Sequence, residues 1–173
     1  DDDTRGVGLA DFDNDGDYDI ITGATNDGSY AQFILYENDG SQGFTKAWTA
    51  DPPKYVDGYV MDMAVSDFNN DGYMDFVVGG NDDNMYLYTN QQNKTFSYSV
   101  AVSKSSVDPN TRGKDAGDFN DDGNMDFIYG DNSDNTYVYL GIGDGNFSRN
   151  LADNNGVGSD DDCIAAGDSD EDG

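Results

Sequence analysis

A nine-residue acidic pattern, repeated along the chain, is the feature that most constrains how this sequence can fold. The pattern Asp-x-[Asp/Asn]-x-Asp-Gly-x-x-Asp occupies residues 11–19, 67–75 and 118–126, and its first six positions return at residues 168–173. A period of about 50 residues is typical of folds that stack one supersecondary unit several times. We therefore treat residues 1–173 as a single repeat region with three complete loops and a partial fourth.

Each repeat contains the signals of four short β-strands. The acidic loop lies between a short strand and an apolar strand that ends at Gly, and a Tyr-rich strand and a strand beginning at Phe follow. Gly, Asp and Asn mark the turns, and no segment has the periodicity of an amphipathic helix. The first strands are expected at residues 7–10, 61–65, 114–117 and 163–166.

The second strand of the repeat indicates how the sheets are arranged. Phe76, Val77 and Val78 are consecutive apolar residues, which is typical of a strand that is buried on both faces. We therefore predict an all-β fold of β-propeller blades, in which each blade is a four-stranded antiparallel sheet.

Because a propeller closes with about four to eight blades and about three are present, we expect a part of a larger propeller or assembly.

Two further expectations concern the strands and their connections. The first repeat is longer than the others between its acidic loop and its fourth strand, and we expect the additional residues in a loop over Gly23–Tyr30.

Tyr86 and Tyr88 lie at a period of two, so they share one face of their strand. We expect this pair to pack between blades, and a platform for stacking sugars is the alternative.

The acidic loop predicts a calcium site. Side-chain oxygens at positions 1, 3, 5 and 9 and the carbonyl at position 7 converge when Gly at position 6 allows a sharp turn. Hard oxygen ligands in this number suit Ca²⁺, which accepts about six to eight of them. The predicted ligands are Asp11, Asp13, Asp15, Asp19 and the Asp17 carbonyl; Asp67, Asn69, Asp71, Asp75 and the Tyr73 carbonyl; Asp118, Asn120, Asp122, Asp126 and the Asn124 carbonyl; and, in the partial loop, Asp168, Asp170 and Asp172. The first loop has the most carboxylates, so we expect it to bind most tightly.

The acidic loop has two other interpretations. An EF-hand needs a bidentate Glu at position 12 and flanking helices, but position 12 is Thr22, Val78 or Tyr129, within predicted strands. A solvated acidic turn without metal stays open, although it crowds several carboxylates without compensation.

The composition limits the function of the chain. It has 36 Asp and Glu against 8 Lys and Arg, no His, and a formal charge of −28. Such a charge is typical of disordered chains, but 12 Tyr and 9 Phe favour a packed core. The missing His excludes Ser-His-Asp and His-ligated zinc sites, and the single Cys163 excludes an internal disulfide. The acidity disfavours nucleic acid as a partner, and no apolar run is long enough for a membrane span.

The repeats resemble the FG-GAP / VCBS family, the calcium-binding blades of integrin α-subunit-like β-propellers. The resemblance is carried by the acidic loop, by the apolar strand that ends at Gly, and by the hairpin over Asn38–Thr45. It implies a secreted or cell-surface protein, because members of the family serve as adhesion modules, lectin-like modules or propellers of polysaccharide-active enzymes.

These observations predict a calcium-binding extracellular β-propeller segment without a catalytic site of its own. We expect a non-catalytic module for adhesion or for glycan or protein binding, with structural calcium. A segment of a calcium-stabilised surface fibre or layer and the propeller part of a polysaccharide-active enzyme stay open as alternatives. The expected partners are calcium, a protein or glycan ligand, and neighbouring blades from the same longer chain or from other copies. The extracellular location follows from calcium, which is millimolar outside cells.

Overall fold

The computed structural model describes residues 3–26, 30–41, 43–50, 62–79, 84–103, 113–130 and 136–153. The first sheet consists of β1 (Asp3–Ala10), β2 (Asp19–Asn26), β3 (Tyr30–Asn38) and β4 (Phe44–Ala50). The second consists of β5 (Met63–Ser66), β6 (Asp75–Gly79), β7 (Met85–Asn90) and β8 (Phe96–Val102). The third consists of β9 (Lys114–Gly117), β10 (Asp126–Gly130), β11 (Thr136–Gly141) and β12 (Phe147–Asp153).

Each sheet is one sequence repeat. The strands of every sheet pair in chain order, and every pair is antiparallel. No helix occurs in the described ranges. The prediction of an all-β fold built from four-stranded antiparallel blades is therefore confirmed.

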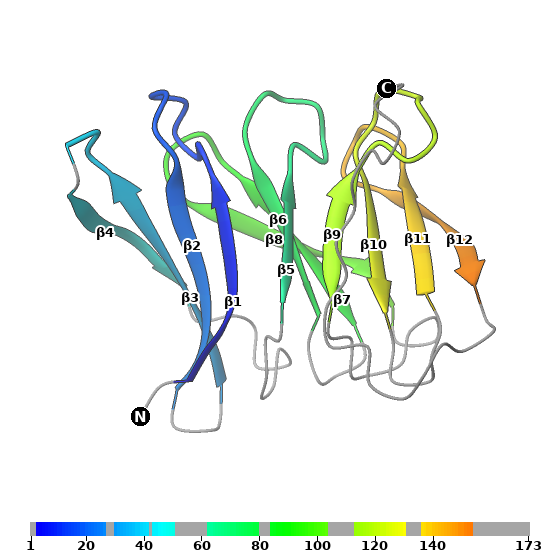
Figure 1. Cartoon of the computed structure of the whole chain (residues 1–173), viewed down its shortest axis with the longest axis horizontal. Helices are drawn as coiled ribbons and strands as arrows, with labels where there is room; N and C mark the ends of the chain where they lie inside the picture. Colours follow the sequence, from blue (N-terminus) through cyan, green and yellow to red (C-terminus); the bar gives the residue numbers. More distant parts are fainter. Residues whose placement is uncertain are drawn as a thin grey trace.

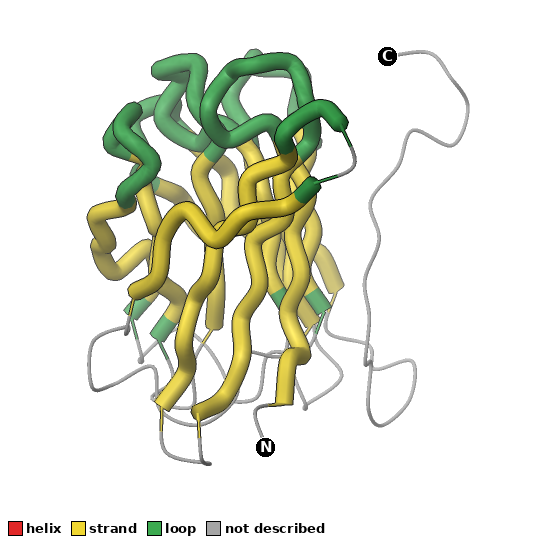
Figure 2. The backbone as a smooth tube through the Cα atoms, turned by 90° about the vertical axis from the view of Figure 1, so that its left-hand side faces the viewer, coloured by secondary structure: helices red, strands yellow, loops and turns green. Residues whose placement is uncertain are grey.

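The three sheets are arranged like neighbouring blades of a propeller. They lie side by side, and the acidic loops all emerge at the same end (Figure 1). Contacts between sheets are concentrated on the first strands, where β1 lies beside β5 and β5 beside β9. After a rotation of 90° about the vertical axis, the loops that the structure describes again lie at one end of the strands (Figure 2).

One hydrophobic core fills the space between the first and second sheets. Phe33 of β3 and Phe76 of β6 are both fully buried, with ring centroids 5.4 Å apart. Tyr86 and Tyr88 belong to the same cluster. The expectation that this tyrosine pair packs between blades is confirmed.

A second core lies between the second and third sheets. Val77 and Leu87 of the middle sheet face Phe127, Tyr129 and Tyr139 of the third. Since Val78, on the opposite face of β6, belongs to the first core, β6 is buried on both sides. The consecutive apolar residues of this strand therefore reflect a sheet covered by two neighbours.

The structure corrects the expectation of a long Gly23–Tyr30 loop. β2 continues to Asn26 and β3 begins at Tyr30, and these two residues still pair in the ladder. The additional residues of the first repeat therefore lengthen two strands, because each further pair satisfies backbone hydrogen bonds that a loop would leave to solvent. β1 likewise extends the expected strand back to Asp3. Of the strand expected at residues 61–65, residue 61 lies outside the described residues, and β5 begins at Met63. The expected strand at 163–166 lies outside the described residues.

The outer face of the first sheet is apolar and partly open to solvent. Leu9, Ile20 and Tyr36 form one cross-strand row, and Leu9 is 62% exposed. Tyr36 holds the place in its strand that the buried Tyr88 holds in the second sheet, counted back from Asn38 and Asn90. This face thus has the composition of a blade interface. In the described part of the chain, no helix has the length and apolar character of a membrane span.

Candidate metal centres

The three complete acidic loops have the same backbone shape. Position 4 is left-handed in each, with φ of 60° at Asn14, 58° at Asn70 and 57° at Asp121. Asn and Asp tolerate this region better than other residues that have a side chain. Position 6 is glycine with a positive φ, which is 86° at Gly72. The sequence pattern therefore matches a sharp turn that needs these residue types at these two places.

A fixed set of hydrogen bonds shapes each loop. In the second loop the Asp71 amide donates to Asp67 Oδ1 at 3.1 Å and to Asn69 Oδ1 at 2.8 Å. The Gly72 amide donates to Asp67 Oδ2 at 2.8 Å, and the Tyr73 amide donates to Asp71 Oδ1 at 2.9 Å. The first and third loops repeat all four bonds at the matching positions. The oxygens at positions 1, 3 and 5 are thereby gathered on one small turn.

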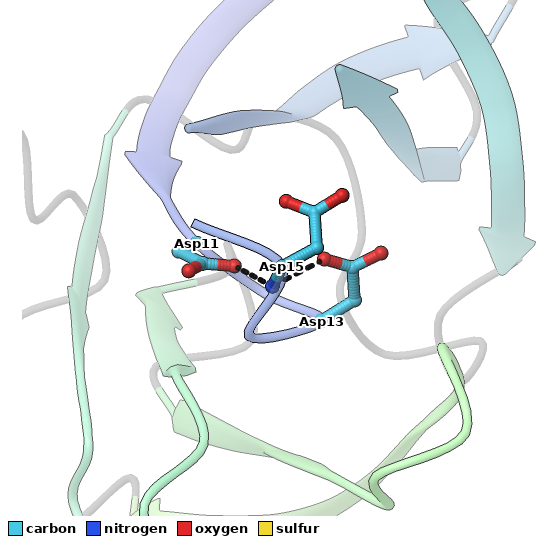
Figure 3. Close-up of side chains that lie close together, drawn as sticks. All are labelled: Asp11, Asp13 and Asp15. Carbon is cyan, nitrogen blue, oxygen red and sulfur yellow. Dashed lines mark hydrogen bonds between the residues drawn. The ribbon is translucent and has the colours of Figure 1, made fainter. Parts of the chain in front are cut away.

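The first loop brings three carboxylates together. One oxygen from each of Asp11, Asp13 and Asp15 lies within 4.8 Å of the others. In Figure 3 the Asp15 amide donates hydrogen bonds to one carboxylate oxygen each of Asp11 and Asp13. The described residues hold no other group of three acidic side chains at this spacing, because position 3 of the other two loops is Asn. Asp19 is not part of the group.

Position 9 is buried beneath the loop at the start of the second strand. Asp19 Oδ1 accepts a hydrogen bond from the Asn38 amide at 2.9 Å, and its Oδ2 accepts one from the Phe12 amide at 3.0 Å. Asp126 makes the corresponding bonds in the third repeat. Burial raises the pKa of both carboxyls above its ordinary value, and these backbone donors oppose the rise. The side chain predicted as a ligand therefore also ties the loop to the hairpin between the third and fourth strands.

Asp75 holds this position in the second loop, and one of its oxygens is less well paired than those of Asp19 and Asp126. Its Oδ1 accepts a hydrogen bond from the Asn90 amide at 2.8 Å. Its Oδ2 is buried and accepts no hydrogen bond of good geometry among the described residues, although the Phe68 amide, the counterpart of Phe12 and Phe119, still lowers the pKa of this carboxyl. Burial, together with the charges of Asp71 and Asp67, raises the pKa of Asp75 to about 7. A buried carboxylate oxygen with only a weak donor is costly, and a cation bound in the loop would stabilise the charged form of Asp75.

Lys94 reaches the first loop from the neighbouring blade, which the sequence pattern does not predict. Its Nζ lies 3.3 Å from Asp13 Oδ2 and also pairs with Glu37 of β3. The hydrogen bond to Glu37 and, less strongly, the one to Asp13 raise the pKa of Lys94. Lys94 lies in the β7–β8 hairpin, and no signal near it in the sequence points to a loop so distant along the chain.

The oxygen atoms that the three loops offer as metal ligands fit a hard divalent cation. The predicted side-chain ligands offer only carboxylate and amide oxygens, which suit Ca²⁺. In the second loop the amides at positions 5, 6 and 7 donate to side-chain oxygens of the same loop and so hold these oxygens on one turn. The partial fourth loop with Asp168, Asp170 and Asp172 lies outside the described residues.

Comparison with known families agrees with this repeat structure. The family profile described as FG-GAP-like repeat matches residues 11–78 and 67–129, and each match runs from one acidic loop through the next. Together the two matches span well over half of the 173 residues. Repeats of this kind form propeller blades and are typically non-catalytic. No curated protein matches the chain.

Proposed function

Because the chain belongs to the family of FG-GAP-like repeats, we propose that it is a calcium-stabilised segment of an extracellular β-propeller that serves as a non-catalytic binding module. The observation that carries the proposal is the loop itself, which recurs in three blades with the same backbone, the same hydrogen bonds and oxygen donors at the same positions. The oxygens at positions 1, 3 and 5 accept the amide hydrogen bonds of the turn and at the same time present a set of hard oxygen ligands on it.

The proposed role of calcium is structural. Each loop connects the first two strands of a blade, and its carboxylates repel one another unless a cation neutralises them. A site that forms only in the folded chain adds its binding energy to stability. A site filled at about 100 times its Kd stabilises the fold by about 2.7 kcal/mol.

The proposed location and ligand follow from the chemistry of the surface. Calcium at millimolar concentration outside cells would fill sites of this kind. The proposed ligand is a protein or glycan, and its chemistry must tolerate a strongly acidic segment, since the formal charge is −28.

We propose further blades as the neighbours of the outer sheets. Phe12 and Phe68, at position 2 of the first two loops, are buried against Phe96 and Phe147 of the next blade. Phe119, at the same position of the third loop, is 40% exposed. A fourth blade placed like the second and third would cover it. Such blades belong either to a longer chain or to another copy.

Thermal unfolding with and without calcium tests the proposal. We expect millimolar calcium to raise Tm by about 5 °C or more over the sample in EGTA, because each filled site adds stability. Magnesium at equal concentration is the control and should raise Tm less, since it demands a tighter octahedral site. An unchanged Tm and circular dichroism spectrum in EGTA would refute structural calcium.

A further inference from the structure

Two side-chain hydrogen bonds join the acidic loops of neighbouring blades. Asn14 Nδ2 donates to the Gly72 carbonyl at 3.0 Å, which connects the first loop to the second. Asn70 Nδ2 donates to Asn124 Oδ1 at 2.9 Å, which connects the second loop to the third. Both donors hold position 4, between two proposed ligand positions, and both are exposed. Neither Asn is itself a proposed ligand, so the repeat pattern assigns them no role beyond the turn.

The residues at the receiving ends are also tied to proposed ligands. Gly72 lies between Asp71 and Tyr73 in the chain, and its amide donates to Asp67 at 2.8 Å. Asn124 is itself position 7 of the third loop, and its Nδ2 donates to Asp122 Oδ1 at 2.8 Å. Each connecting bond therefore joins two segments whose positions depend on the ligands beside them.

We propose that calcium binding is positively coupled between neighbouring loops, and that Asn14 and Asn70 transmit the coupling. The inference rests on the proposed calcium sites. A cation that orders the second loop holds the Gly72 carbonyl in place, so Asn14 and the first loop lose less freedom when they bind their own cation. Ordering that is already complete at one site lowers the entropic cost at the next. By linkage the effect is equal in both directions.

Electrostatics acts in the opposite sense and can be separated. A bound Ca²⁺ reduces the negative potential at the neighbouring loop and so weakens the second binding event. This contribution falls as salt screens it, with a Debye length of about 10 Å at 0.1 M. The hydrogen-bond contribution does not depend on salt in this way. Titrations at about 0.3 M KCl therefore reduce the Coulomb part and leave the proposed coupling.

Site-resolved calcium titration by ¹⁵N NMR tests the coupling. The amides of Gly16, Gly72 and Gly123 each donate to the first carboxylate of their own loop, so each reports on one loop. The informative variant is Asn14→Gly, because glycine adopts the left-handed backbone without strain. We expect it to weaken calcium binding at the unaltered second loop by about three- to tenfold, the range for one net hydrogen bond.

A second variant and a control complete the experiment. Asn70→Gly is expected to weaken binding at the third loop by a similar factor. Asp121→Gly makes the same backbone change at position 4 of the third loop, from which no bond to another loop leaves among the described residues, and should leave the first two loops unchanged. If Asn14→Gly and Asn70→Gly alter only their own loops, or none, the coupling is refuted. If no glycine signal of the wild-type chain responds to calcium, the proposed calcium sites themselves are wrong.

Discussion

Phe68→Ala should destabilise this protein far more than Phe119→Ala, although both residues hold position 2 of an acidic loop. Phe68 is 1% exposed, and its ring lies 6.4 Å from that of Phe127 and 5.5 Å from that of Phe147, both in the third sheet. Phe119 is 40% exposed, and within the described residues no ring of another sheet contacts it. The pair therefore compares one side chain in two environments.

The expected magnitudes follow from these environments. Replacing a buried Phe by Ala costs about 3 to 5 kcal/mol, since the lost transfer energy and the cavity add. The two aromatic contacts of Phe68 place it in the upper part of that range. A side chain that is already partly in water loses less, about 1 to 2 kcal/mol, and leaves no closed cavity. The difference of about 2 to 3 kcal/mol corresponds to a Tm difference of about 5 to 10 °C for a chain of this size.

Urea unfolding in saturating calcium measures both variants. The free energy of unfolding and its slope with urea are compared with those of the wild type, so that a change in the unfolded state is recognised by its slope. Phe12→Ala is the parallel case for the first loop, where the ring is 2% exposed and lies 5.8 Å from that of Phe96. Equal losses for Phe68→Ala and Phe119→Ala would refute the assignment of Phe119 to an open blade face.

Three further predictions concern the acidic loops and a buried lysine. Asp15→Ala should lower Tm in calcium more than Asp71→Ala or Asp122→Ala, because the first loop has four predicted carboxylate ligands and the others three; calorimetry checks this, and a smaller loss for Asp15→Ala contradicts the ranking. Lys94→Met should raise the calcium affinity of the first loop about threefold at low salt, since the Lys94 ammonium lies 3.3 Å from Asp13. Calcium titration checks this, with the exposed Lys46→Met as the control, and an equal effect of the two variants would disprove the contact. Desolvation lowers the pKa of Lys114 to about 8, although Asp62 opposes the shift. Between pH 8 and 10 the unfolded chain therefore binds more protons than the folded chain, so the free energy of unfolding should rise with pH by up to about 2 kcal/mol. This rise should vanish in Lys114→Met. Above about pH 10 stability should fall, since burial raises the pKa of Tyr88 and Tyr129, and a steady fall from pH 8 in urea unfolding would refute the role of Lys114.

The blade pattern could be derived from the sequence because it depends on local chemistry. The glycine at position 6 has a positive φ in each complete loop, and consecutive apolar residues mark the strand that two neighbours cover. The strand expected at 114–117 coincides with β9. For the same reason the sharp turn of each complete acidic loop could be predicted from its residue pattern alone.

The assignment of calcium ligands is only partly a local matter. The gathering of Asp11, Asp13 and Asp15 follows from the turn that these residues form. The burial of Asp75 does not, because it depends on the hairpin that packs over it, where the Asn90 amide donates to its Oδ1. The length of β2 and β3 could not be predicted from the residue pattern either. The same number of additional residues can form a longer loop or lengthen the two strands that flank it.

The repeat, its strand order and the chemistry of its loops are thus written in the sequence, because they depend on residues a few positions apart. Contacts between blades had to be decided by the tertiary structure. Lys94 lies beside Asp13, and Asn14 donates to Gly72, across many intervening residues. Such pairs form only when two sheets pack face to face and place their loops at the same end, and no periodicity within one repeat encodes which loops become neighbours.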